Sequence, residues 1–597
     1  MAARRKHRLQ RYFLRLLLLW LGATLPTAAL DREAFTVTRY QLEVQIDRPS
    51  HVMAVTGKLT LRNDSDKAQN NAALQVSSSL SWNSITLDQQ PLQWLGDNYT
   101  SDIDHTGSLS EAIVTLPKPV PPRGSVTLDV QYGGTITADA TRLTRMGMPA
   151  DVALRSDWDE ISDAFTAVRG LGYVVWYPVA IDAVSMSDGN AVFDAIAAWK
   201  RRHARSEFAA RITVSGGSAE TLCIAMNGVV PSCGEAGEIS DPESGGKLKE
   251  FSNTLTMDGL GETVPAFAIA NYVELSRPTV TFLHTAEHTS VARDYALAAK
   301  TNDPLLHDWL GEPRQAARVV ELTEPKAAPY ESGGMLFTPL RQAPVSTLQL
   351  LLLPAQVEAR FHPARAWIQE GLQRFLQAVS VESRSGRKAA LEYLDELREP
   401  LVKDEEAAHP KTESTSKPAS EADNTLLNTD DELYLRGKGS FVLWMLRDML
   451  GDTAMQSALA AYRPGADKEP NYLQRLLQSS SRRDLEWFFD DWVYRDRGLP
   501  EFHVESAYAR PLLSESRKSF LLTVTIQNRG HAGAEVPVLV QTPSGEKSLR
   551  VLVKAGERES GRIELPVAPE KIVVNDGSVP EANTGNNEYK LPPPQSP

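Results

Sequence analysis

One carboxylate lies in a stretch of this sequence whose other residues favour burial. Glu370 comes three residues after Trp367 and is followed by Gly371, Leu372 and Phe375. The apolar positions repeat at roughly helical spacing. A buried carboxylate without a partner is costly, so Glu370 needs a cation beside it. That cation is either a neighbouring arginine or a metal ion.

The W-x-x-E-G pattern resembles the third zinc-ligand motif of the aminopeptidase N-type (membrane alanyl aminopeptidase) gluzincin metallopeptidases. The resemblance implies an upstream H-E-x-x-H helix, in which two histidines bind zinc and the glutamate is the general base. The corresponding positions here hold Pro354, Ala355 and Glu358. The zinc motif is therefore degenerate, and Glu370 is the one ligand at its family position.

A second ligand set can be drawn from the same stretch. Glu358 and His362 are four residues apart and could join Glu370 around an ion. Pro363 ends that helix at once, however, and no general base is evident.

A different zinc motif precedes this region. His284, Glu287 and His288 match the inverzincin string H-x-x-E-H, with Glu370 downstream. The preceding residues TVTFL are typical of a strand, and Thr285 is a natural N-cap. We therefore expect His284 at a strand end and His288 in the first turn of a helix, not both on one helix.

Two further positions follow from the resemblance. In the family, a G-A-M-E-N segment carries a glutamate that binds the free α-amine of the substrate, and Glu331 matches that glutamate. A later tyrosine of the family donates to the oxyanion. Arg436 occupies that place in register with Lys438, while Tyr434 lies two residues earlier.

The replacement of tyrosine by arginine suggests what balances Glu370. A guanidinium at position 436 would fill the space vacated by zinc and bond the Glu370 carboxylate bidentately. We therefore predict an Arg436–Glu370 ion pair inside the fold.

Composition and the N-terminus indicate an exported globular protein. The 597 residues are 42% hydrophobic and 23% charged, with a net charge of −13. This charge argues against nucleic acid and anionic membranes as partners. Residues 1–29 combine a basic head, an apolar run and small residues, as in a secretory signal, whose retention as an anchor is the alternative. No later segment is apolar enough to span a bilayer.

The two cysteines, Cys223 and Cys233, flank an Asn227-Gly228 hairpin signal. In an exported chain we expect them to form a disulfide.

The predicted architecture is multidomain α+β. Residues 30–275 read as an antiparallel β domain, similar to the family's N-terminal saddle. Residues 276–500 read as a thermolysin-like, mainly helical peptidase-type domain, with a disordered loop at 405–428. Residues 501–582 read as an immunoglobulin-like β-sandwich, and residues 583–597 as a disordered tail.

Two functions remain open. The first is a non-catalytic protein, periplasmic or extracellular, that binds a peptide or an exported protein through the old cleft without a cofactor. The second is an active zinc aminopeptidase with an altered ligand set.

Overall fold

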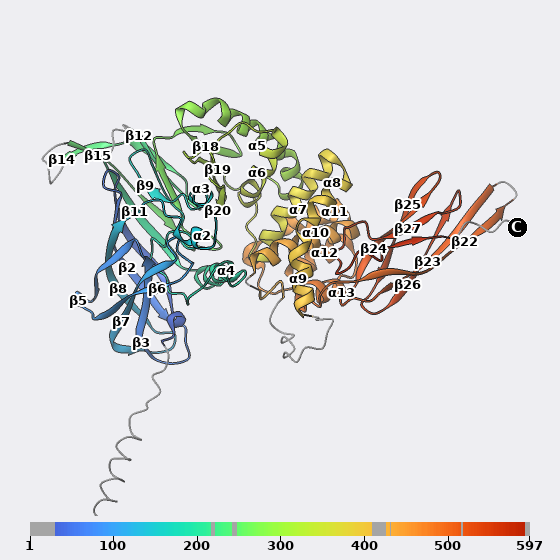
Figure 1. Cartoon of the computed structure of the whole chain (residues 1–597), viewed down its shortest axis with the longest axis horizontal. Helices are drawn as coiled ribbons and strands as arrows, with labels where there is room; N and C mark the ends of the chain where they lie inside the picture. The colour runs from blue at the N-terminus through green and yellow to red at the C-terminus, as the bar shows by residue number, and fades with distance from the viewer. Residues whose placement is uncertain are drawn as a thin grey trace, which may run out of the picture.

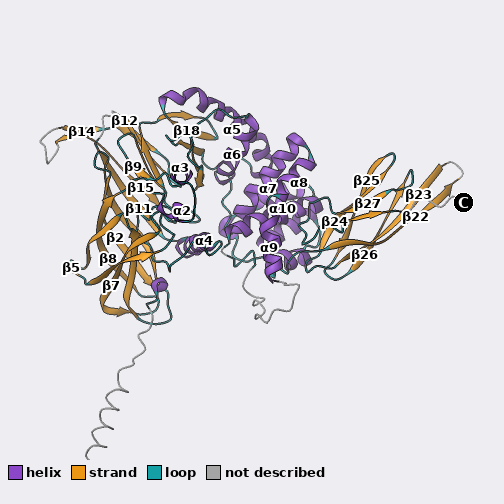
Figure 2. Ribbon diagram, viewed as in Figure 1, coloured by secondary structure: helices purple, strands orange, loops and turns teal. Residues whose placement is uncertain are grey.

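The computed structural model describes residues 30–216, 221–240, 247–408, 425–429, 431–514 and 517–591. Three parts follow one another along the long axis of the molecule: β-rich, largely helical, and β-rich again (Figures 1 and 2). This is a multidomain α+β protein. The expected signal segment, 1–29, lies outside the described residues. None of the described helices has the length and hydrophobicity needed to cross a bilayer.

The N-terminal part is built on an eight-stranded sheet in the order β14-β15-β11-β1-β2-β8-β4-β5. Along β1, residues alternate between buried and exposed because one face of the sheet covers the core. Its strands are β1 (Phe35–Asp47), β2 (Val52–Asn63), β4 (Leu80–Leu87), β5 (Gln90–Pro91), β8 (Ser125–Thr135), β11 (Glu207–Ser215), β14 (Gly237–Ser240) and β15 (Lys247–Met257).

The expectation of a purely antiparallel domain is wrong at one place, because β1 and β11 run parallel. Parallel neighbours need a long connection. Here it contains four more strands of the same sheet, one complete further sheet, part of another, and the helix α4 (Ala191–His203), which ends just before β11. The additional strands are β3 (Gln69–Ser77), β6 (Trp94–Thr100), β7 (Ser108–Val120), β9 (Glu160–Ile161), β10 (Phe165–Val168), β12 (Thr221–Met226), β13 (Ser232–Glu235) and β16 (Phe267–Ala270); the short helices are α2 (Thr141–Arg145) and α3 (Ala150–Ser156).

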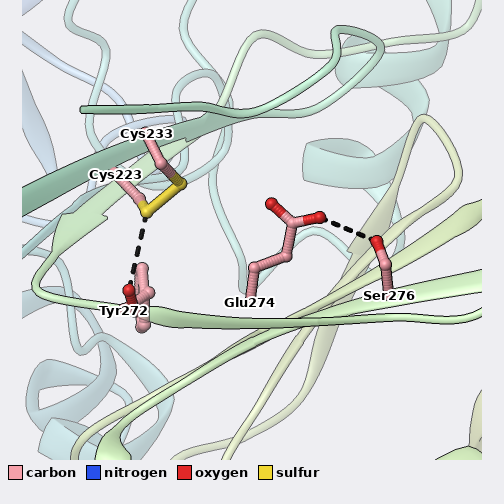
Figure 3. The surroundings of a disulfide bond; sticks show 5 residues. All are labelled: Cys223, Cys233, Tyr272, Glu274 and Ser276. Carbon is pink, nitrogen blue, oxygen red and sulfur yellow. Dashed lines mark hydrogen bonds between the residues drawn. A yellow bond between two sulfur atoms is a disulfide. The ribbon is translucent and has the colours of Figure 1, made fainter.

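A disulfide joins the two cysteines across the hairpin of β12 and β13. Cys223 and Cys233 are directly opposite each other in the register of the pair. Figure 3 shows the bond above Tyr272, the residue just before Val273, and the Tyr272 carbonyl oxygen lies 3.7 Å from the Cys223 sulfur. The turn contains Asn227 and Gly228, as the Asn-Gly signal predicts, and Gly228 has a positive φ of 74°.

The middle part begins with a five-stranded sheet in the order β17-β18-β19-β21-β20. Its strands are β17 (Val273–Ser276), β18 (Val280–His284), β19 (Ala317–Glu321), β20 (Tyr330–Ser332) and β21 (Met335–Thr338). The central three strands are parallel, with antiparallel strands at both edges. The expected boundary at 275/276 falls inside β17, which pairs with β18 and so belongs to this sheet.

Helices form the rest of the middle part. The long ones are α5 (Thr289–Leu310), α6 (Val345–Glu358), α7 (Ala366–Ser385) and α10 (Glu432–Leu450), joined by α8 (Arg387–Asp395), α9 (Arg398–Ala408), α11 (Asp452–Ala461), α12 (Tyr472–Ser481) and α13 (Glu486–Phe489). The loop expected at 405–428 is wrong at its start, because residues 405–408 continue α9. The Glu405 carboxylate there accepts a hydrogen bond from Leu499 N–H at 2.8 Å. Residues 409–424 lie outside the described residues.

Two sheets form the C-terminal part, in the orders β22-β23-β26 and β25-β24-β27-β28. Their inward side chains, such as Val524 and Val538, share one core with the helices. The strands are β22 (Phe502–Ser514), β23 (Arg517–Asn528), β24 (Ala534–Thr542), β25 (Gly545–Val553), β26 (Arg558–Leu565), β27 (Lys571–Val574) and β28 (Glu588–Lys590). The tail expected at 583–597 is wrong in part, because β28 pairs with β27. Residues 592–597 lie outside the described residues.

Candidate functional site

Two helices cross closely enough to bring their side chains together at the predicted centre. A Cβ on Gly371 of α7 would lie 2.6 Å from the carbonyl carbon of Gly439 on α10, and a Cβ on Gly439 would lie 2.7 Å from the Trp367 carbonyl oxygen. Only glycine allows the backbones to approach so closely. Glu370 and Arg436 flank this crossing, which sets them side by side.

The predicted Arg436–Glu370 contact is present. Arg436 donates from Nε at 3.0 Å and from Nη2 at 2.9 Å, and both bonds go to Oε2 of Glu370. The expected fork to both carboxylate oxygens is therefore wrong, because the guanidinium approaches from one side. The side chains are 27% and 18% exposed, so the pair is only partly buried. The Glu370 carboxylate, with help from Glu432 and Glu331, raises the pKa of Arg436 above its usual range.

Helix α6 supplies no zinc ligands at the positions of the family's histidine and base. Pro354 lies inside the helix, where its ring removes the hydrogen bond to the carbonyl four residues earlier. That carbonyl, of Leu350, instead accepts a hydrogen bond from Gln377 Nε2 of α7 at 2.7 Å. Proline and alanine have no donor atom for a metal. At this point the contact between α6 and α7 therefore stabilises the packing of the two helices.

The residues present do not fit the zinc site that the resemblance implies. Among the described residues, no group of three His, Cys, Asp or Glu side chains is placed to hold a metal ion. The cationic guanidinium of Arg436 is bonded to the one retained ligand, Glu370. A second cation at that oxygen would meet repulsion from the first.

The second ligand set is not arranged on one helix. Helix α6 ends at Glu358, so His362 follows the helix and does not lie one turn further along it. Glu358 and His362 nevertheless line the same cavity. Burial and the neighbouring Arg314 lower the pKa of His362, against the opposing effect of Glu358. A neutral imidazole therefore faces the carboxylate.

Glu331 lies on the edge strand β20 and faces Glu358. Their carboxyl groups are within hydrogen-bonding reach, while Oε1 of Glu331 is buried without a partner among the described residues. Burial, Glu358 and Glu370 hold the pKa of Glu331 well above its ordinary value, and Arg436 opposes them. Its surroundings therefore favour the neutral form of the Glu331 carboxyl, and a cation beside it would favour the ionised form.

The disulfide hairpin supports the turn that follows Glu331. Asn227 is fully buried and donates from Nδ2 to Ser332 Oγ at 3.0 Å and to the Val264 carbonyl oxygen at 2.7 Å. Gly228 N–H reaches the Gly333 carbonyl oxygen at 3.3 Å. Sequence reasoning treated Asn227 and Gly228 only as a turn signal and missed this role.

Tyr434, which was also predicted near the family's oxyanion position, directs its hydroxyl to Asp496. It is buried and donates its hydroxyl to Asp496 Oδ2 at 2.7 Å. Its hydroxyl also accepts from Lys438 Nζ at 2.9 Å, and Lys438 contacts the same aspartate. Tyr434 precedes Arg436 by two residues, so the two side chains point to different faces of α10.

A cavity of about 570 Å³ separates the N-terminal and middle parts. One wall is residues 256–263, from the end of β15 and the loop after it, and the other contains Gly333, Glu358, His362 and Gln369. Beside it, Lys200 of α4 bonds Glu432 of α10 at 2.5 Å. The cavity and this ion pair join residues from distant parts of the sequence, which local patterns do not reveal.

The inverzincin string is divided as expected. His284 is the last residue of β18, and His288 is the last residue of the 3₁₀ turn η2 (Ala286–His288). His284 is buried and bonds the Thr285 carbonyl oxygen at 2.7 Å, while His288 contacts the buried Glu321. The N-cap expected of Thr285 is wrong in one respect, because its side chain makes no capping hydrogen bond.

Comparison with family models finds no match for the chain, and comparison with curated proteins finds none. Solved structures do resemble it. A variant M1 zinc metallopeptidase from Deinococcus radiodurans, bound to a Tyr-Ser-Ala substrate, is 14% identical with a TM-score of 0.44; 77% of this chain and 94% of that chain are covered.

Legionella pneumophila aminopeptidase A, in complex with aspartic acid, is 13% identical with a TM-score of 0.53. The match covers 92% of this chain and 59% of that chain, so this chain spans less than two thirds of the Legionella enzyme. The protein therefore has an aminopeptidase-like fold. At this identity the likeness concerns the fold alone.

Proposed function

We propose that this is an exported, non-catalytic protein of the aminopeptidase N type that binds peptides by their free N-terminus in the old active-site cleft. The Arg436–Glu370 pair is the observation that carries the proposal. A guanidinium held on the retained ligand position provides positive charge without a Lewis-acid site. The three parts of the chain then correspond to a saddle domain, a thermolysin-like domain and an immunoglobulin-like sandwich.

The cleft offers the chemistry that an N-terminal ammonium needs. Glu331 and Glu358 face each other without a basic side chain bonded to either of them among the described residues. An ammonium between them would remove their repulsion and complete the hydrogen bonds of the buried Glu331 oxygen. Peptide is therefore the partner class that we favour.

Export is part of the proposal and has two supports. Residues 1–29 have the order of a secretory signal, a basic head followed by an apolar run and small residues. The Cys223–Cys233 disulfide is typical of an oxidising compartment, periplasmic or extracellular.

The alternative is an active zinc aminopeptidase with an altered ligand set. One observation favours it, since Glu358 and His362 line one cavity and Glu370 lies on the adjacent helix. This reading requires Arg436 to leave Glu370 when the ion binds.

Metal analysis and peptide binding on the purified full chain separate the two functions. We expect no stoichiometric zinc, no hydrolysis of amino-acid anilides, and binding of a free-amine alanyl peptide but not of its N-acetylated form. Glu331→Gln should weaken that binding, and Glu546→Gln, on the exposed start of β25, should not. One equivalent of tightly bound zinc that is lost on Glu370→Ala would favour the enzyme instead.

A further inference from the structure

One carboxylate of the cleft has no role in the site described above. Glu262 lies in the loop after β15 and lines both the large cavity and the small recess beside it, where Glu370 and Glu432 are found. Within the described part of the chain, Glu262 has no hydrogen bond and no ion pair. The nearby cations are engaged elsewhere: Lys200 bonds Glu432, and Arg201 donates to the Asn428 carbonyl oxygen at 2.9 Å.

Side chains of both signs surround Glu262, but neither nearby cation is bonded to its carboxylate. Burial raises the pKa of its carboxyl, and Glu370 and Glu432 raise it further, while Lys200 and Arg201 only partly oppose this effect. A partly buried carboxylate in this condition gains most from a cation that arrives from outside.

A second, independent observation indicates what kind of ligand brings that cation. Gln369 is 8% exposed, lines both cavities, and its Nε2 has no hydrogen-bond partner in the described structure. A buried amide donor without a partner is costly, so the site calls for a ligand with an acceptor such as a peptide carbonyl oxygen. A simple polyamine has no such acceptor.

We infer that Glu262 selects peptides whose first residue is lysine or arginine, with Gln369 bonding a carbonyl oxygen of the same peptide. The inference rests on the proposed function, in which Glu331 and Glu358 hold the α-ammonium. Glu262 then takes the second positive charge from the opposite wall of the cavity. The ligand class is a short basic peptide with a free N-terminus.

The test is calorimetric titration of the full chain with two peptide amides, Lys-Ala-Ala-Ala and norleucine-Ala-Ala-Ala, at constant ionic strength. Their first side chains have similar length and differ mainly in charge. We expect the lysine peptide to bind about tenfold more tightly, as one partly desolvated ion pair provides. Glu262→Gln should abolish this preference and leave the norleucine affinity unchanged.

A matched control separates this role from the general charge of the cavity. Asp258→Asn removes one charge from the same cavity, but at an exposed position on its rim, and should retain the preference. Gln369→Leu should weaken both peptides equally, by about fivefold for one lost hydrogen bond. Circular dichroism and the unfolding midpoint of each variant establish that it is folded.

The outcomes distinguish the two proposals. Equal affinity of the wild-type protein for both peptides, or equal weakening of both by Glu262→Gln, would overturn the role of Glu262 and leave peptide binding intact. A preference lost in Asp258→Asn but kept in Glu262→Gln would overturn it in favour of the rim residue. Binding of neither peptide would overturn the proposed function itself.

Discussion

Gly371 on α7 and Gly439 on α10 pack backbone against backbone, and this contact holds Arg436 beside Glu370. A Cβ on Gly439 would lie 3.1 Å from Gly371 Cα as well as 2.7 Å from the Trp367 carbonyl oxygen. The position of the Arg436 guanidinium therefore depends on the close backbone approach at Gly439, one helical turn away. Two groups of opposite charge alone would not fix this geometry.

The first prediction concerns that crossing. Gly439→Ala should lower the free energy of unfolding by about 1–3 kcal/mol, because the methyl group must displace main-chain atoms of α7. Gly465→Ala is the matched control, since its Cβ would meet no heavy atom within 4 Å. Chemical denaturation of both variants is the measurement. A Gly439→Ala protein at least as stable as wild type would show that the helices can separate freely.

The second prediction concerns the ion pair. Arg436→Ala should reduce the free energy of unfolding by about 1–2 kcal/mol, between the values for exposed and buried pairs, because both groups are partly solvated. The double variant with Glu370→Gln should recover part of this loss. Additive effects in the double-mutant cycle would mean that the two side chains do not interact in solution.

Arg436 was predictable from the sequence because the family resemblance, aligned on Lys438, fixes the position on one helix that faces Glu370. Sequence reasoning did not identify the partner of Tyr434, because that partner, Asp496, lies 62 residues away. No local pattern marks such a contact. The same limit explains the end of α9, where the Glu405 carboxylate bonds the main chain of Leu499. Glu262 and Gln369 were also missed, because they line the same cavities only in the folded chain, where the loop after β15 lies near α7.

For the strands, too, the sequence predicts some features and not others. Alternation of side chains identified β1 and β2, since each has one face in the core. The pairing of β1 with β11 was not predictable, because periodicity indicates a strand without indicating its neighbour. The tail strand β28 has three residues, and its burial depends on β27 more than on its own composition.

The third prediction concerns the disulfide. Replacing Cys223 and Cys233 by serine should destabilise the hairpin by about 2–3 kcal/mol, as expected for a closed loop of this size, since the cysteines are separated by 10 positions. Because Asn227 supports Ser332, peptide affinity should also fall. Reductant should reproduce both effects in the wild-type protein and have no further effect on the double variant. Unchanged binding after reduction would show that the turn after Glu331 holds its shape without the hairpin.

The last prediction is a pH dependence in the C-terminal part. Glu581 is fully buried and accepts hydrogen bonds from Phe502 N–H at 2.8 Å, from Asn587 Nδ2 at 2.7 Å and from the Asn575 amide. Burial nevertheless raises the pKa of its carboxyl from 4.5 to about 7. Because the folded pKa is the higher one, the folded state binds more protons than the unfolded state between these values, and stability falls as pH rises.

The expected loss is about 3 kcal/mol between pH 4.5 and 7. Hydrogen exchange of the amides of β22 and β27, corrected for the intrinsic rate at each pH, reports the stability of this part alone. Glu581→Gln should flatten the pH dependence, although it also weakens the hydrogen bonds, whereas Glu546→Gln should leave the slope unchanged. Stability that rises over the same interval would mean that the three donors outweigh burial, so that the carboxylate is folded in its ionised form.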